Sequence, residues 1–278
     1  MATSQSTELR SLAQRLADAL PPVVDEIVLT GGVARGVADA WSDVELLVVH
    51  APLPSLGQVE EWAVRVGATI TTRFADDELA YVAGTYEDTM VELVWLVPGA
   101  IDALLDRAFA GELVDHARLR TCEALEQGIA LRGGEHLRTW QTRLATYPVS
   151  LRTALILDAI DDWGGYPLDA YLRQAHRDDR YALVKVVLEV AEDVLRLLFA
   201  LNCRWEPSWK RLAELLAPLE RVPPNAAARI ESALTEPDPR SALLEVFEIA
   251  RDSVAPLDAE LDVSRARTWL DEAVAALQ

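Results

Sequence analysis

The chain has 278 residues, of which 51% are hydrophobic, and its formal net charge at pH 7 is −19. The length predicts two domains, and the composition is sufficient for a sizeable core. The negative charge argues against a long nucleic-acid partner, because clustered Lys and Arg normally neutralise the phosphates of such a partner. The same charge suits a cationic acceptor, since an acidic cleft raises the local concentration of a polycation.

The sequence indicates neither a membrane partner nor export. No apolar stretch approaches the ~20 residues that a membrane span requires, and Met1 to Ser6 lack the basic region and the hydrophobic core of a signal peptide. Cys122 and Cys203 lie far apart and form no metal-binding motif with the four histidines. We therefore expect a cytoplasmic protein whose two cysteines are reduced packing residues.

The first part of the chain predicts a mixed sheet covered by short helices. Leucines recur at helical spacing until Pro21-Pro22 ends the first helix, and β-branched or alternating apolar residues indicate the strands. Glu87-Asp88 joins the last two strands in a predicted hairpin. In chain order, we expect a helix over 7–20, strands over 27–30 and 43–50, a helix over 54–67, and strands over 69–74, 79–86 and 89–97.

From Pro98 onward, helical periodicity dominates. One short extended segment over 128–134 is closed by glycines, and we place the domain boundary there. The prediction is an α+β chain with a mixed-sheet domain over 1–134 and an all-helical domain over 135–278. The helices expected in the second domain cover 135–146, 149–163, 167–176, 179–201, 207–218, 223–235, 239–254 and 260–277.

The region from Ile27 to His50 contains the strongest functional signal. Gly31-Gly32 follows a buried strand, and such a turn lets the backbone approach a ligand and directs free N–H groups of the next helix at an anion. Asp43 and Glu45 begin the next strand and project from the same face of it, because side chains alternate along a strand. A phosphate-binding turn beside two carboxylates that can hold metal ions indicates nucleotide chemistry.

This pattern resembles the signature of the nucleotidyltransferase superfamily, and particularly its antibiotic-modifying adenylyltransferases. The resemblance covers roughly the first half of the chain. It implies two Mg²⁺ ions held by Asp43, Glu45 and a third carboxylate on a later strand, which Glu92 supplies within an apolar run. Many members have Ser at the second turn position, where Gly32 can offer only its N–H group. The resemblance also implies a helical half that helps to bind the acceptor.

On this reading, Asp43, Glu45 and Glu92 are the catalytic residues, and ATP is the substrate. Glu92 is our first candidate for the general base, and Asp178 or Glu189 is the second. Besides Gly31 and Gly32, three residues are candidates for nucleotide binding: Arg35, Ser42 and Lys185. Arg35 either assists the phosphates or only solubilises the short helix.

Lys185 is one of only two lysines beside 24 arginines, the other being Lys210. Such compact charges suit phosphate groups. Lys185 lies on one helix face with Asp178, Tyr181 and Glu189, but an ordinary solvated pair with Glu189 explains it equally well. The stretch from Asn202 to Lys210 is similar to an Asn-Arg-x-x-Pro-x-x-Lys ending of helical domains in such proteins.

Three functions remain open. The first is an enzyme that transfers AMP from ATP to a hydroxyl of a small molecule such as an aminoglycoside or lincosamide, conferring antibiotic resistance. The second is a protein-adenylylating regulator of the antitoxin type, although such antitoxins are usually shorter. The third is an inactive nucleotide-binding or scaffold relative. A homodimer is also left open.

Overall fold

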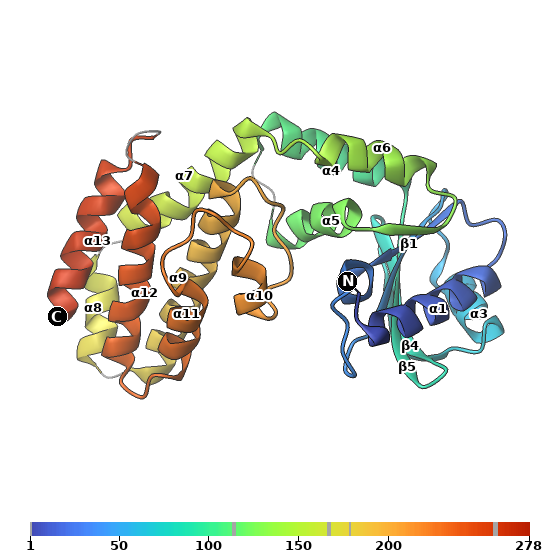
Figure 1. Cartoon of the computed structure of the whole chain (residues 1–278), viewed down its shortest axis with the longest axis horizontal. Helices are drawn as coiled ribbons and strands as arrows, with labels where there is room; N and C mark the ends of the chain where they lie inside the picture. Colours follow the sequence, from blue (N-terminus) through green and yellow to red (C-terminus); the bar gives the residue numbers. More distant parts are fainter. Residues whose placement is uncertain (1, 113–114, 166–167, 178, 258–260) are drawn as a thin grey trace. The chain divides into compact units, whose positions relative to one another are not determined.

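The computed structural model describes residues 2–112, 115–165, 168–177, 179–257 and 261–278 (Figure 1). The chain divides into two compact units, one formed by Met1–Ala108 with Val114–Thr146, and the other by Phe109–Leu113 with Tyr147–Gln278. None of the helices in the described ranges combines the length and the apolar character that crossing a membrane would require.

The first unit contains one mixed sheet of six strands in the order β3-β4-β5-β2-β1-β6. Only β2 and β5 run parallel, and every other neighbouring pair is antiparallel. The predicted mixed sheet and the α+β fold class are therefore confirmed. The strands are β1 (Glu26–Thr30), β2 (Val44–Val49), β3 (Thr69–Ala75), β4 (Leu79–Tyr86), β5 (Thr89–Leu96) and β6 (Ile129–Arg132).

The β4–β5 connection is the predicted hairpin. Glu87 and Asp88 both have positive φ, at 47° and 63°. Two successive residues of this kind form the tight turn whose twist matches that of the flanking strands. The turn therefore fixes the register in which Ala83 lies opposite Glu92.

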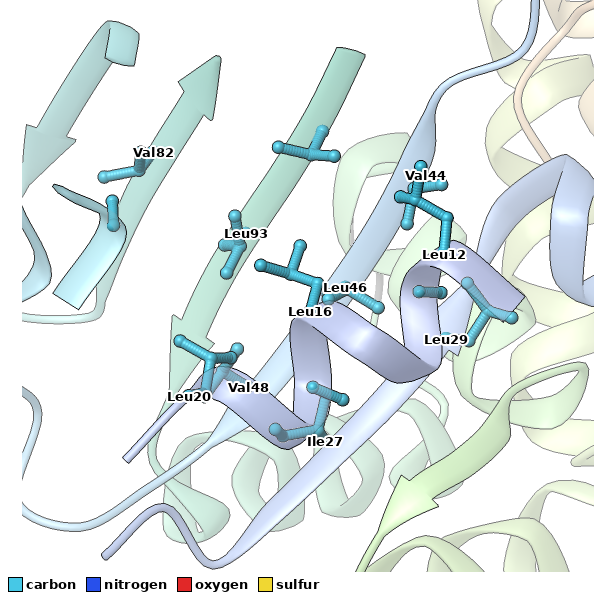
Figure 2. Packing of buried hydrophobic residues seen from close by; sticks show 14 of the residues in the cluster. Leu12, Leu16, Leu20, Ile27, Leu29, Val44, Leu46, Val48, Val82 and Leu93 are labelled. Atoms are coloured by element: carbon cyan, nitrogen blue, oxygen red, sulfur yellow. The ribbon is translucent and has the colours of Figure 1, made fainter. Parts of the chain in front are cut away.

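One face of the sheet packs into the main hydrophobic core (Figure 2). Helix α1 (Ser4–Ala19) lays Leu12 and Leu16 over Leu46 and Leu93, and α3 (Leu56–Arg65) adds Val59 and Trp62 to the same cluster. Because side chains alternate, burying Leu46 and Val48 on this face turns Glu45 and Leu47 to the opposite face. The alternation of side chains along β2 thus places Glu45 on the face opposite this core.

Four further helices belong wholly or largely to the first unit: α2 (Gly31–Arg35), α4 (Pro98–Ala110), α5 (His116–Glu126) and α6 (Glu135–Leu144). We expected the domain boundary after Gly134, but the division places α6 in the first unit. The buried Glu26 carboxylate accepts hydrogen bonds from the backbone N–H groups of His136 (2.7 Å) and Leu137 (3.2 Å). It therefore caps α6 from β1, a contact that no local pattern reveals.

The second unit is helical, as predicted. Phe247, Trp269 and Tyr171 pack edge-to-face in its interior, with ring centroids 5.3–6.0 Å apart. The helix expected over 207–218 is shorter, because Arg211 adopts the left-handed conformation (φ 57°) that helices exclude. The helices are α7 (Val149–Gly165), α8 (Leu168–His176), α9 (Arg180–Leu201), α10 (Leu212–Leu216), α11 (Ala226–Thr235), α12 (Pro239–Val254) and α13 (Ser264–Leu277), with a 3₁₀ turn at Ala255–Leu257.

The two cysteines have different environments, and both are free. Cys122 is buried, as expected of a packing residue, and burial raises the pKa of its thiol to about 12. Cys203 is exposed, so the expectation that it also packs in the core was wrong.

Candidate functional site

The glycine turn links the end of β1 to the short helix α2 (Gly31–Arg35). Gly31 has φ +66°, in the left-handed region where a side chain is strained. A Cβ atom at Gly31 would lie 2.5 Å from Oε1 and 2.6 Å from Cδ of Glu45, so the Glu45 carboxyl group occupies the space that the missing side chain leaves. At Gly32, a Cβ atom would meet nothing within 4 Å. The two glycines of the motif therefore have different roles.

The two strand carboxylates lie next to each other across the parallel pair. Glu45 on β2 is in register with Glu92 on β5, so both project from the face opposite the core. Asp43 precedes β2 by one residue, at the alternation that gives it the same face as Glu45. All three side chains are partly buried. The structure thus brings together the acids that the sequence places 49 residues apart, from 43 to 92.

Tyr81 on β4 belongs to the same group, although our sequence reasoning did not select it. Burial and the negative charges of Glu92, Asp43 and Glu45 raise the pKa of its phenol to about 12. One phenol therefore experiences all three carboxylates. The signal that could have found Tyr81 is the hairpin register, which places Tyr81 diagonally across from Glu92 on one face.

These residues offer a suitable donor set for a divalent cation, because carboxylate oxygens are the ligands that Mg²⁺ prefers. In the part of the chain that the structure describes, however, no three Asp, Glu, His or Cys side chains are gathered closely enough to hold a metal ion. Like charges on adjacent strands repel, which favours separated side chains without a cation. A three-carboxylate metal site at Asp43, Glu45 and Glu92 thus stays a prediction.

The turn before Asp43 is ordered by its own polar groups. The Ser42 hydroxyl donates to Oδ1 of Asp39 (3.0 Å) and accepts from the backbone N–H group of Asp39 (2.9 Å), and Trp41 N–H also donates to Asp39 (2.9 Å). Ser42, a predicted nucleotide-binding residue, therefore shapes the entry to β2. Trp41 itself is 95% exposed.

Arg35 binds a carboxylate that the sequence analysis did not consider. Its Nη1 lies 3.0 Å and 3.2 Å from the two carboxylate oxygens of Glu123 on α5, and the Glu123 side chain is only 11% exposed. Burial raises the pKa of Glu123, while the Arg35 charge opposes that increase. Arg35 thus anchors α2 to α5; its role toward a nucleotide stays a prediction.

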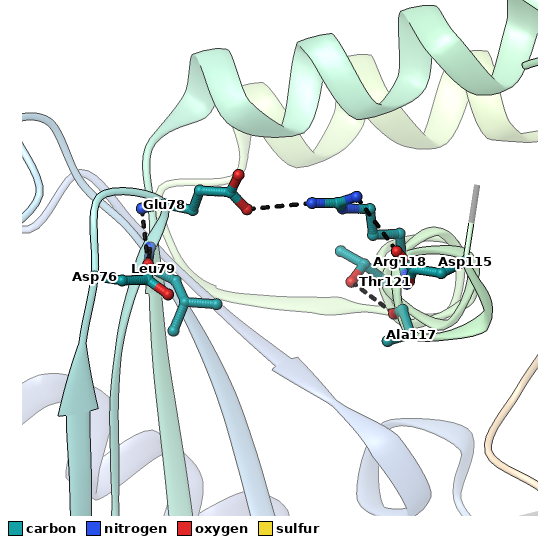
Figure 3. A network of polar contacts seen from close by, with 7 residues as sticks. All are labelled: Asp76, Glu78, Leu79, Asp115, Ala117, Arg118 and Thr121. Carbon is teal, nitrogen blue, oxygen red and sulfur yellow. Dashed lines mark hydrogen bonds and ion pairs between the residues drawn. The ribbon is translucent and has the colours of Figure 1, made fainter. Parts of the chain in front are cut away.

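An exposed network ties the start of β4 to α5 (Figure 3). Arg118 pairs with Glu78 in the turn before β4 and with Asp115 at the start of α5, both at 3.3 Å. Asp76 accepts from the backbone N–H groups of Glu78 and Leu79, and these bonds lower its pKa. Exposed ion pairs contribute little to stability individually. These contacts lie in the turn that leads into β4, the strand that carries Tyr81.

The polar face predicted on α9 lies in the second unit. Nζ of Lys185 is 2.8 Å from Oε1 of Glu189, and both side chains are largely exposed, so the predicted i,i+4 pair is confirmed. Asp178, the other alternative base, lies outside the described residues. A nucleotide-binding role for Lys185 stays a prediction.

Asn202 belongs to the stretch that resembled a family ending, and its structural role is clear. Its side chain donates to the carbonyls of Leu198 and Arg221 and accepts from the N–H groups of Glu220 and Arg221, at 2.7–3.0 Å. The amide thus closes the end of α9 onto residues 220–221.

Two stretches of the sequence match known families. Residues 9–89 match the family described as a nucleotidyltransferase domain. Residues 115–211 match a family described as a domain of unknown function, DUF4037. A search of curated proteins finds no match. The first unit is thus similar to nucleotidyltransferase domains over residues 9–89, and its resemblance to antibiotic adenylyltransferases stays a prediction.

Two solved structures are similar to the chain at low sequence identity. One is a nucleotidyltransferase-like protein from Exiguobacterium sibiricum 255-15, with 12% identity, coverage of 97% of this chain and 79% of that chain, and a TM-score of 0.43. The other is the Thermotoga maritima CCA-adding enzyme complexed with tRNA, with 11% identity, coverage of 95% and 83%, and a TM-score of 0.19.

Proposed function

We propose that the chain transfers AMP from ATP to a hydroxyl group of a small molecule. The observation that carries this proposal is the grouping of Asp43, Glu45 and Glu92 on one face of the sheet, beside the Gly31 turn. The nucleotidyltransferase match supports nucleotide transfer in general. The proposal goes beyond this match where it names the acceptor, the nucleotide and the metal.

Asp43, Glu45 and Glu92 would hold divalent cations, two in the proposed mechanism. Bound there, such ions neutralise the charge that develops on the attacking and leaving oxygens of the transferred phosphate. The open space at Gly32 leaves the backbone accessible to the triphosphate. Gly31 contributes by having no side chain, since this is what admits the Glu45 carboxyl group.

A base must remove the proton from the attacking hydroxyl group. The Glu92 carboxylate is our first candidate, because it lies in register with Glu45. Glu189, the other candidate from the sequence among the described residues, lies in the second unit, where it pairs with Lys185. The two assignments differ in their unit, so substituting each residue distinguishes them.

The proposed acceptor class is a cationic, aminoglycoside-like antibiotic. Its support is the net charge of −19, which would concentrate a polycation near the protein. An acceptor of this kind would weaken its binding as salt is added, because screening shortens electrostatic attraction. A neutral acceptor would show little of that dependence.

The test is transfer of label from α-³²P-ATP in the presence of Mg²⁺, with panels of aminoglycosides, lincosamides and proteins as acceptors. We expect label on a small molecule, loss of transfer in Asp43→Asn, and normal transfer in Asp88→Asn, a matched change at the exposed hairpin turn. Label on a protein instead would establish the regulatory alternative. Absence of labelling together with absence of Mg²⁺-dependent ATP binding would refute the proposal.

A further inference from the structure

The first half of α9 presents an apolar stripe to solvent. Over residues 190–201 the helix is mostly buried, whereas over residues 180–189 its buried side chains are Leu183 and Val187. Three large apolar side chains in this first half are exposed: Tyr181 (83%), Val184 (43%) and Leu188 (44%). Their spacing of three and four residues places them on one face of the helix.

The same stripe continues into the buried half of α9. Ala191, Leu195 and Leu198 follow Leu188 at the same alternating spacing, and all three are buried. A seven-residue repeat of apolar side chains is the pattern of a helix that packs lengthwise against another helix. The later part of the stripe is thus covered, and the earlier part has the same pattern but faces solvent. The pattern therefore predicts a helical partner for the exposed part.

The charges beside the stripe indicate which partner fits. Lys185 and Glu192 lie seven residues apart on the same flank, and both are exposed. Lys185 also pairs with Glu189 of its own helix at 2.8 Å. In a second copy of α9 that runs antiparallel, Lys185 of each copy comes within reach of Glu192 of the other, because a two-fold axis repeats every contact. A parallel copy would instead align Lys185 with Lys185.

We propose that the exposed stripe of Tyr181, Val184 and Leu188 binds the same stripe of a second copy of this chain, with the two α9 helices antiparallel. The two-fold axis lies midway between Val184 and Leu188, so that each packs against the other across the interface. Tyr181 is the aromatic anchor of the contact, since such side chains contribute strongly to interfaces. This inference does not depend on the proposed function.

The expected complex is weak. One helical stripe from each copy makes a small interface, so we expect a dissociation constant on the order of 10–100 μM. Sedimentation velocity over a concentration series that spans this range measures it directly. The buffer contains a reducing agent, because Cys203 is exposed and could otherwise cross-link two chains.

The first test compares Leu188→Glu with Val149→Glu. Val149 is also apolar and 73% exposed, but it begins α7 close to Tyr147, whose ring packs on Trp205 beyond the C-terminal end of α9. Leu188→Glu should raise the dissociation constant by about 10-fold or more, because it buries an unpaired carboxylate. Val149→Glu adds the same charge and should associate as the wild type does. Thermal unfolding verifies that both variants are folded.

The second test reverses the charges beside the stripe. Lys185→Glu and Glu192→Lys should each weaken self-association by about 3- to 10-fold, because either change replaces two attractions by two repulsions. An equimolar mixture of the two variants should associate more tightly than either variant alone, since every Lys then faces a Glu. This recovery is specific to the antiparallel arrangement and cannot come from a variant that merely fails to fold.

Three results would overturn the inference. The first is a wild type that stays monomeric throughout the concentration series, which would mean that the stripe has some other partner or none. The second is self-association of Leu188→Glu as strong as that of Val149→Glu. The third is a mixture of Lys185→Glu and Glu192→Lys that associates no more tightly than the separate variants.

Discussion

Replacing Gly31 by Ala tests how the turn and the carboxylates depend on each other. The new methyl group meets two obstacles: a backbone at φ +66° and the carboxyl group of Glu45 at 2.5–2.9 Å. The backbone conformation costs about 1–2 kcal/mol for a residue with a Cβ atom. The carboxyl group is the flexible end of a side chain, so it yields at a smaller cost in stability but loses its position.

The expected stability effect follows from these numbers. A loss of about 1–2 kcal/mol corresponds to a fall in melting temperature of about 2–8 °C for a domain of this size. Cation-dependent activity should fall much further, because displacement of a ligand by about 1 Å can cost about 10²-fold in rate. A modest loss of stability with a large loss of activity would be the signature of a displaced Glu45.

Gly32→Ala is the matched control, since a Cβ atom there meets nothing within 4 Å and its φ lies outside the strained region. We expect this variant to be as stable as the wild type or more stable, because alanine reduces the entropy of the unfolded chain. Differential scanning calorimetry and cation titration of both variants provide the comparison. Equal melting temperatures for Gly31→Ala and the wild type would refute the reasoning.

Three further predictions concern separate contacts. Glu92→Gln should raise the stability of the cation-free protein by about 0.2–1 kcal/mol, because it removes the repulsion between like charges on paired strands. The same change should abolish the stabilisation by Mg²⁺ that is measured in thermal unfolding. A variant that Mg²⁺ stabilises as strongly as the wild type would contradict this prediction. The raised pKa of Glu123 means that the folded state favours the protonated carboxyl group, so its contribution to stability is complete below the ordinary value of 4.5 and is lost as the pH rises through the folded-state pKa. The stability of Glu123→Gln relative to the wild type should therefore increase from pH 4.5 toward neutrality, and a constant difference in melting temperature would disagree. Asn202→Ala removes four hydrogen bonds and should lower the free energy of unfolding by about 2–4 kcal/mol. Nucleotide binding by the folded variant should be unchanged. Impaired nucleotide binding by a variant of full stability would instead indicate that Asn202 contacts a ligand.

Features with local causes could be predicted from the sequence. The glycine turn, the alternation that separates Asp43 and Glu45 from the core, and Glu92 within an apolar strand all depend on neighbouring residues. The hairpin at Glu87-Asp88 was predicted for the same reason, and its turn geometry agrees. Local chemistry thus predicts most elements of the first unit, whereas the site formed by the three acids stays a prediction.

Features that depend on distant pairings could not be predicted. Glu123, for example, meets Arg35 across 88 residues of sequence. Helix α6 belongs to the first unit, where Glu26 of β1 caps it across more than 100 residues of sequence. The sequence shows a carboxylate at the start of an apolar strand but does not show which helix that carboxylate caps.

The single parallel pair of the sheet also has a consequence for the nascent chain. Strand β2 can join β1 soon after synthesis, because only the glycine turn and α2 separate them, whereas β5 follows only after α3, β3 and β4. Closing that longer loop carries the larger entropic cost and favours late pairing. The proposed three-carboxylate site would therefore form only after the chain up to Glu92 has left the ribosome.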